Sequence, residues 1–212
     1  MQRLRHLQHP VQVPSYRSGG LTMKLDVYFV GVGGQGVLTM ADILMQASLS
    51  RDIPCNFYPT KGMAQRGGFV KAQLRLGDDA CGPEIGPGGA DVVIAMEQSE
   101  ALKALDYLKP DGDMIVLGYR WLPTDVMLGR AAYPDAERLA QEAAKRTKNY
   151  WYLDSTLVPE NGSNNVFLLS AAQKMTALSR LFSAEELKNV IFARFPKGIE
   201  RNRLSFERGQ TV

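Results

Sequence analysis

The sequence predicts an α/β fold: a single domain with three layers and a doubly wound, mostly parallel sheet of the Rossmann-like type. Three observations lead to this prediction. Short apolar segments alternate along the chain with segments whose apolar residues recur at helical spacing. A glycine-rich turn, Gly31–Gly36, joins the first strand-like segment to the first helix-like one. The chain has 212 residues, 45% of them hydrophobic, which suits one domain with an ordinary core.

The first half of the chain shows the alternation most clearly. Leu25–Val30 is an apolar strand, and the helix from Gly34 to about Ser50 carries its apolar residues on one face. Ile53–Tyr58 is the next strand. Phe69–Leu76 alternates apolar with polar residues, which is typical of a half-buried strand near the edge of a sheet. The glycine-rich segments that follow these two strands are predicted loops: Pro59–Gly68 and Gly77–Gly89.

The second half continues the pattern. Pro134 suits the first position of a helix, where its missing N–H needs no partner. Ser183 and Glu186 have the spacing of a capping box, which predicts a helix start. Tyr119–Tyr133 is predicted to be irregular. The remaining elements are strands at Asp91–Met96, Met114–Leu117 and Tyr150–Asp154, and helices at Gln98–Leu108, Pro134 to about Lys148, Asn164–Phe182 and Ser183 to Phe195.

Residues 1–23 are expected to form a disordered or partner-bound arm ahead of the domain at 24–212, or to precede a true start at Met23. They hold Arg3, Arg5 and Arg17 and no acidic residue, so they account for the net charge of +3. The other 22 basic residues balance the 22 acidic ones. The domain therefore has no basic field of the kind that attracts nucleic acid. No sustained apolar run predicts a signal peptide or a membrane span.

The domain is poor in the side chains that carry much of enzyme chemistry. Both histidines, His6 and His9, fall in the arm, and the domain has two cysteines, Cys55 and Cys81. This composition excludes Ser–His–Asp and Cys–His machinery, a zinc site and an iron–sulfur cluster. We therefore expect no catalytic residue and no metal ligand in this chain. Cysteines without a signal peptide indicate reduced thiols and a cytoplasmic protein.

The glycine turn has the GxGxxG pattern of a dinucleotide-binding turn, placed after a strand and before a helix. Its candidate binding residues are Gly31, Gly33, Gly34, Gln35 and Gly36. However, the second strand, Ile53–Tyr58, does not end in the acidic residue that would hold a ribose. Three interpretations stay open: NAD(P) binding, a turn that only packs helix against strand, and binding of an anion or a group like coenzyme A.

The loop Lys61–Gly68 is expected at the carboxyl end of the second strand, beside the glycine turn, where doubly wound sheets bind ligands. Its candidate site residues are Gln65, Arg66, Gly67 and Gly68. The guanidinium of Arg66 suits a carboxylate or phosphate, although it could equally pair with an acidic residue of this chain or of a partner.

Four further residues or segments resemble site features. Asn164 begins a predicted helix and is a candidate for polar ligand contact as well as for capping. Glu97 ends a buried strand, where it could face the same cleft or cap the next helix. Cys81 lacks a base and reads as a packed thiol. Asp111–Asp113 has the order Asp-Gly-Asp, which does not match a thiamine diphosphate motif.

Several motifs together resemble the γ-type subunit or domain of pyruvate/2-oxoacid:ferredoxin oxidoreductases. They are GVGGQG at Gly31–Gly36, GMAQRGG at Gly62–Gly68, PEIGPGGADVVIAME at Pro83–Glu97, the run Asn161–Leu168, and a tail, Glu200–Gly209, that looks like the closing helix of that family. The form MAQRGG is similar to the indolepyruvate β subunits, whereas pyruvate and 2-oxoglutarate enzymes tend to carry YGxExRGG there. Asp125–Tyr133 shows no pattern of the family.

The resemblance implies the non-redox subunit of an enzyme that converts an arylpyruvate, coenzyme A and oxidised ferredoxin to an aryl-acetyl-coenzyme A, CO2 and reduced ferredoxin. It implies that thiamine diphosphate and the iron–sulfur clusters belong to a large α subunit, and that ferredoxin meets the complex. This chain would then bind no cofactor by itself, and would at most shape the coenzyme A or substrate cleft. The alternatives are a free-standing NAD(P)- or flavin-binding oxidoreductase and an adenylating enzyme.

Overall fold

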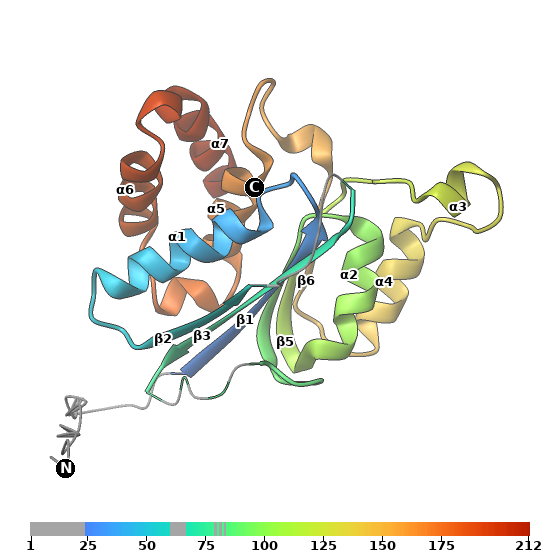
Figure 1. The fold of residues 1–212 in the computed structure, drawn as a ribbon, viewed down its shortest axis with the longest axis horizontal. Helices are drawn as coiled ribbons and strands as arrows, with labels where there is room; N and C mark the ends of the chain where they lie inside the picture. Colours follow the sequence, from blue (N-terminus) through green and yellow to red (C-terminus); the bar gives the residue numbers. More distant parts are fainter. Residues whose placement is uncertain (1–23, 60–66, 79, 81, 83) are drawn as a thin grey trace, which may run out of the picture.

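A computed structural model describes residues 24–59, 67–78, 80, 82 and 84–212, which form one α/β domain around a six-stranded sheet (Figure 1). The sheet order is β2-β3-β1-β4-β5-β6. β1, β4, β5 and β6 pair in parallel, whereas β3 is antiparallel to both β1 and β2. The predicted mostly parallel α/β sheet is confirmed. The strands are β1 (Lys24–Val32), β2 (Cys55–Pro59), β3 (Phe69–Gly77), β4 (Ala90–Ala95), β5 (Leu108–Leu117) and β6 (Tyr150–Leu153).

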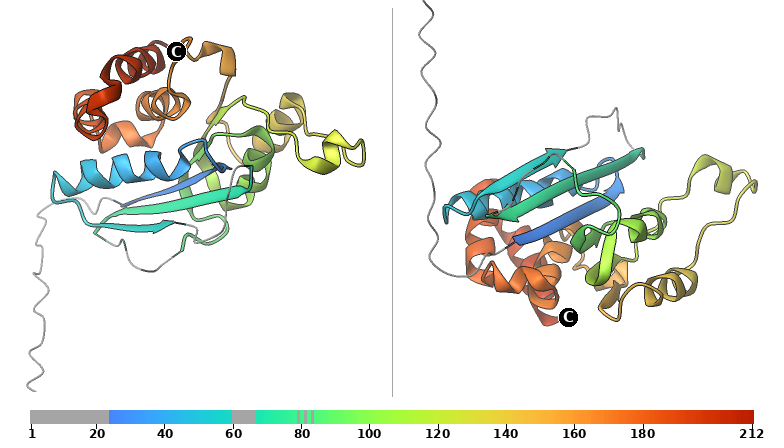
Figure 2. Two further views of the ribbon diagram at one scale, coloured as in Figure 1. Left: turned by 45° about the horizontal axis from the view of Figure 1, so that its top comes forward. Right: turned by 90° about the horizontal axis from the view of Figure 1, so that it is seen from below.

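Helices cover both faces of the sheet (Figure 1 and Figure 2). On one side lie α1 (Val37–Leu49), α5 (Asn164–Met175), α6 (Ala184–Arg194) and α7 (Ile199–Thr211). On the other lie α2 (Gln98–Ala104) and α4 (Ala136–Ala144). The short α3 (Thr124–Met127) projects away from the body. Short 3-10 helices lie between these elements, at Leu105–Tyr107, Ser155–Leu157, Ala177–Arg180 and Pro196–Gly198.

Alternation along the strands divides the core between the two faces. In β1, Val27 and Phe29 point into the large core under α1, α5, α6 and α7, whereas Tyr28 and Val30 point into a smaller core under α2 and α4. All four side chains are at most 1% exposed. Burial of each such side chain contributes about 1.5–3 kcal/mol. The sheet is therefore fixed from both sides, which gives its carboxyl edge a rigid base.

Five predicted helix boundaries were wrong. The helices predicted to end at Leu108 and near Lys148 end at Ala104 and Ala144, and the other three boundaries differ for local reasons. α1 begins at Val37, not Gly34, because Gly36 precedes it in the left-handed conformation, at φ 84°. α4 begins after Pro134: Asp135 is the N-cap, and its carboxylate accepts from Arg138 N at 2.7 Å. The helix predicted over Asn164–Phe182 ends at Met175, since Thr176 is extended and caps the 3-10 turn that follows.

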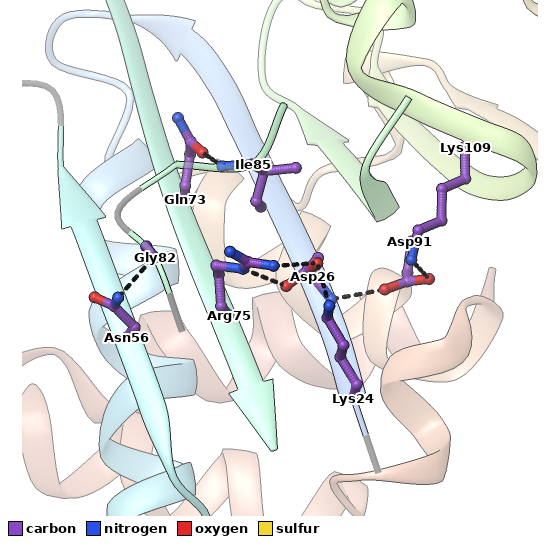
Figure 3. A network of polar contacts seen from close by, with 9 residues as sticks. All are labelled: Lys24, Asp26, Asn56, Gln73, Arg75, Gly82, Ile85, Asp91 and Lys109. Carbon is purple, nitrogen blue, oxygen red and sulfur yellow. Dashed lines mark hydrogen bonds and ion pairs between the residues drawn. The ribbon is translucent and has the colours of Figure 1, made fainter. Parts of the chain in front are cut away.

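Polar contacts hold the described part of the β3–β4 connection against β2 and β3 (Figure 3). Asn56 donates to the carbonyl of Gly82 at 2.8 Å, and Gln73 accepts from the N–H of Ile85. On the same face Arg75 donates to Asp26 at 2.9 Å, and the Asp26 carboxylate is only 4% exposed. These buried charges are paired and hydrogen-bonded, as low-dielectric surroundings require. The connection thus covers sheet surface that no described helix covers.

The capping box predicted from the sequence is present at α6. Glu186 accepts from the backbone N–H and the hydroxyl of Ser183, both at 2.7 Å, and these hydrogen bonds lower the pKa of Glu186. A carboxyl group with a lowered folded-state pKa stabilises the fold above its unfolded pKa of about 4.3, and loses that effect as the pH falls through the lower folded value.

Ser183→Ala should therefore lower the free energy of unfolding by about 1 kcal/mol at neutral pH. The difference from the unmodified chain should shrink at acid pH, as the pH falls through the lowered pKa of Glu186 and the carboxylate becomes protonated. Urea unfolding of the variant and of the unmodified chain at both pH values measures this difference. Ser179→Ala is a suitable control, because its hydroxyl donates only to the carbonyl of Thr176. An equal loss at both pH values would show that the carboxylate plays no part in the cap.

Candidate functional site

The glycine turn lies at the carboxyl edge of the parallel strands, between the end of β1 and the start of α1. Gly33 donates to the carbonyl of Gly68 at 2.8 Å, and Gly67 donates back to Gly33 at 3.5 Å. The end of the predicted loop Lys61–Gly68 is therefore beside the turn, where the sequence placed it. Gln65 and Arg66, and likewise Cys81, lie outside the described residues.

Strand β3, rather than β2, is the neighbour of β1 on this side of the sheet. In a dinucleotide-binding fold the second parallel strand stands next to the first and presents its terminal acid to the ribose. Here that place is filled by the antiparallel start of β3, at Gly68 and Phe69. The topology therefore adds to the sequence argument against an NAD(P) site at this turn.

Two glycines of the turn are required by close packing. A Cβ atom on Gly31 would stand 2.7–2.9 Å from Gln35, Val37 and Met96, closer than real Cβ contacts allow. A Cβ on Gly36 would stand 2.4 Å from the side-chain amide nitrogen of Asn165, and Gly36 also has a positive φ. These two positions are thus explained by packing and backbone conformation alone.

The side chain of Gln35 is used structurally. Its Oε1 accepts from the N–H of Val32 at 2.9 Å, and its Nε2 donates to the carbonyl of Met96 at 3.1 Å. The amide therefore joins the ends of β1 and β4. Gln35 was predicted as a binding residue, but both polar atoms of its side chain already serve the protein itself.

The first turn of α1 is the part of this edge best suited to an anion. No side chain caps the helix, and its first turn contains no acidic residue. The unpaired N–H groups and the helix dipole therefore favour a negatively charged group. Gly34, at φ 96°, is exposed, and no atom lies within 4 Å of the place where its Cβ would be.

Asn165, the neighbour of the predicted Asn164, contacts the glycine turn. Asn165 packs against Gly36, and its Oδ1 accepts from Ser163 Oγ at 2.6 Å. The two asparagines occupy the first and second positions of α5, so they point in different directions. The sequence shows two adjacent candidates, and only the packing of α5 against α1 distinguishes them.

Glu97 is buried at the base of the segment Tyr119–Tyr133. Its carboxylate is the N-cap of α2 and accepts from the Glu100 N–H at 2.9 Å and from Ser99 Oγ at 2.7 Å. It also accepts from the Trp121 N–H at 3.0 Å and from the hydroxyl of Tyr133. Burial, together with this hydrogen bond, raises the pKa of Tyr133. Glu97 therefore caps a helix and fixes both ends of a loop.

This anchoring places the indole of Trp121 against Gly67. A Cβ on Gly67 would stand 2.8 Å from Trp121 Nε1, and Gly67 has φ 87°. Beyond Trp121 the segment projects from the body and carries two well-exposed apolar side chains, Met127 at 66% and Leu128 at 57% (Figure 1). No sequence pattern indicated Trp121 at the site, apart from its position after the end of a buried strand.

The described residues offer little redox or nucleophilic chemistry at this edge. Among them no group of three or more His, Cys, Asp or Glu side chains is placed to hold a metal ion. Burial raises the pKa of the Cys55 thiol, which disfavours the reactive thiolate. Within the same residues no helix is long and apolar enough to cross a membrane.

The fold and this edge define a doubly wound α/β domain with a glycine turn that contributes backbone rather than side-chain chemistry. Residues 26–212 match the model of the pyruvate ferredoxin/flavodoxin oxidoreductase family, and the chain belongs to that family. A subunit named indolepyruvate oxidoreductase subunit IorB from Pyrococcus horikoshii is 33% identical over 190 residues, which cover 87% of this chain and 93% of that one. Its namesake from Archaeoglobus fulgidus is 35% identical over 142 residues, covering 67% and 70%.

The fold has counterparts among solved structures. The pyruvate oxidoreductase subunit PORC of Thermotoga maritima superposes with a TM-score of 0.66 at 19% identity, covering 89% of this chain and 96% of that one. At this identity the likeness shows the fold alone. The resemblance to γ-type subunits that the motifs suggested is thereby confirmed at the level of family and fold.

Proposed function

We propose that this chain is the non-redox subunit of an indolepyruvate or arylpyruvate:ferredoxin oxidoreductase. The observation that carries the proposal is its 33% identity to an indolepyruvate oxidoreductase subunit across nearly the whole of both chains. The family match makes it a subunit of a 2-oxoacid:ferredoxin oxidoreductase. The arylpyruvate substrate and the division of labour with a large, thiamine diphosphate- and cluster-bearing partner in the cytoplasm are the proposed part.

In the proposed reaction, an arylpyruvate loses CO2, its acyl group joins the sulfur of coenzyme A, and the electron pair passes one electron at a time to ferredoxin. Thiamine diphosphate would supply the carbanion chemistry and the clusters the electron path, both on the partner. The residues of this chain would position the substrate and coenzyme A and enclose them. The glycine turn and the adjoining Gly67–Gly68 offer backbone N–H groups to coenzyme A or to the partner.

The structure supports an accessory role rather than independent catalysis. At the carboxyl edge Gln35 and Glu97 are fully engaged in hydrogen bonds that hold the edge together. Among the described residues of this edge, the backbone at Gly34 and in the first turn of α1 stays available to contact another molecule. A rigid surface of this kind can align a substrate against chemistry that a partner provides.

Co-expression with a large thiamine-dependent subunit tests the proposal. The complex should reduce ferredoxin when given indolepyruvate and coenzyme A, and neither chain should do so alone. Preference for pyruvate over arylpyruvates would contradict the proposed substrate. Reduction of ferredoxin or tight binding of a nicotinamide or flavin nucleotide by this chain alone would contradict the accessory role.

Arg66 gives the sharpest single-residue test of the predicted loop. If its guanidinium holds a carboxylate or phosphate in the cleft, Arg66→Ala should lower turnover of the complex by about tenfold or more, since a charge-assisted hydrogen bond contributes about 1.5–3 kcal/mol. Assembly, measured by gel filtration, should be unchanged. Loss of assembly would make Arg66 an interface residue, and normal turnover would remove it from the site. Lys145→Ala, at an exposed pair with Glu142, is the matched control.

A further inference from the structure

A hollow lies where three helices begin. It has a volume of about 460 Å³, within the range of small-molecule pockets. Its walls come from the first turn of α1, the start of α5, the turn between α6 and α7, and the first turns of α7. The residues that the argument uses are Thr39, Asn165, Arg194, Lys197, Arg201 and Asn202.

The three helices share an unusual feature at this hollow. The N-caps of α1, α5 and α7 are Gly36, Ser163 and Gly198, and none of these residues accepts a hydrogen bond from its helix with a side chain. The longer helices elsewhere in the described chain are capped by side chains, α4 by Asp135 and α6 by Ser183. In α5 one first-turn N–H, that of Val166, is satisfied instead by Asn165 Oδ1 at 3.0 Å. The remaining free N–H groups at the three N-termini add their partial positive charges at this hollow.

The side chains strengthen this charge. Arg194, Lys197 and Arg201 line the hollow, and no acidic residue does. Arg194 is paired with Asp42 at 3.2 Å, and Arg201 donates to the carbonyl of Gly162 at 2.8 Å, so each keeps its position. Lys197 has no ion pair within the part of the chain that the structure describes. The charge of the hollow is therefore only partly compensated.

Asn202 is the independent sign of a ligand. It is 6% exposed and lines the hollow, yet its side chain makes no hydrogen bond to any described residue. Its amide atoms stay accessible from the hollow, whereas the amides of such largely buried side chains are usually hydrogen-bonded within the protein. A bound molecule with acceptor atoms would satisfy the Asn202 amide.

We infer that this hollow binds the phosphate group of a small phosphorylated molecule. Phosphate oxygens accept hydrogen bonds from uncapped helix N–H groups, from hydroxyl and amide side chains such as Thr39, Asn165 and Asn202, and from the nearby cations. The hollow has room for more than a free ion, which favours an organic phosphate. The inference does not rest on the proposed function, because it concerns binding by this chain without coenzyme A or a partner.

Titration calorimetry on the full chain, at constant ionic strength in chloride, tests the inference with ribose 5-phosphate and inorganic phosphate as probes. Ribose 5-phosphate should bind. Lys197→Ala should weaken its binding about tenfold, whereas Lys145→Ala, which removes a cation on α4, should leave binding unchanged. Tighter binding of ribose 5-phosphate would identify an organic ligand, and equal binding would identify phosphate itself. Absence of binding by both probes at about 10 mM would overturn the inference.

Asn202→Asp provides a readout that a merely structural asparagine would not give. The substitution keeps the shape but places a negative charge in the hollow, so it should abolish phosphate binding. In the absence of ligand the thermal midpoint should stay the same or rise, because a carboxylate is favoured in the early turns of α7 and near Arg194, Lys197 and Arg201. A falling midpoint with unchanged binding would refute an electropositive site at Asn202.

Discussion

Glu97→Ala should lower the free energy of unfolding by about 3–5 kcal/mol, because it removes a buried carboxylate that accepts four hydrogen bonds. The side chain is 0% exposed, so water cannot replace it without entering the core. The N–H groups of Glu100 and Trp121 would lose their acceptor, and each such buried donor costs about 1–3 kcal/mol. The expected loss of stability is therefore larger than the loss of about 1 kcal/mol that follows removal of a helix cap.

Urea unfolding of three variants separates the parts of this effect. Glu97→Gln keeps the shape and one acceptor oxygen, so it should cost roughly half as much. Glu142→Ala removes an exposed carboxylate paired with Lys145 and should change stability by less than about 0.5 kcal/mol. A Glu97→Ala variant within about 1 kcal/mol of the parent chain would show that the loop is held by other contacts.

Tyr133 gives the same prediction a local readout. Burial and the hydrogen bond to Glu97 raise its pKa. When Glu97 is replaced by alanine, the pKa of Tyr133 should fall toward the ordinary value of about 10, which spectrophotometric titration of the phenol detects. An unchanged pKa would assign the whole effect to burial.

The parts of the fold that depend on residues close together in the sequence could be predicted. The glycine turn, the alternating strands and the capping box of α6 are local patterns, and each appears in the structure. The sheet order could not be predicted so easily. β3 inserts between β1 and β2 through pairing of residues far apart in the chain, such as Lys24 with Gly77. Its half-buried alternation indicated a place near the edge but not its direction.

The site was predicted less completely than the fold, because its residues come together through packing. Asn165 contacts Gly36 because α5 lies against the start of α1, and no other feature brings the two residues together. The hollow beyond it joins Thr39 to Asn202, which no short motif could connect. The sequence did locate the glycine turn, but it could not show that the amide of Gln35 joins β1 to β4 and is thereby withdrawn from ligand contact.

Gly31→Ala should destabilise the fold by about 2–3 kcal/mol, even with no ligand or partner present. The new methyl group would stand 2.7 Å from Gln35 Oε1, 2.8 Å from Val37 and 2.9 Å from Met96. Overpacking of this kind costs about 1–3 kcal/mol, and the upper part of the range applies because Gln35 cannot move without breaking its bonds to Val32 and Met96. The thermal or urea midpoint of the isolated chain measures the loss.

Gly34→Ala is the matched substitution within the same turn. Nothing lies within 4 Å of its new methyl group, so the cost should be limited to about 1 kcal/mol of backbone strain at φ 96°. If the turn also approaches coenzyme A or the partner, the substitution at this exposed position should lower turnover of the complex although the fold survives. Normal turnover in Gly34→Ala, together with a destabilised Gly31→Ala, would mean that the glycine turn only packs helix against strand, and the ligand role would then rest on the start of α1 alone.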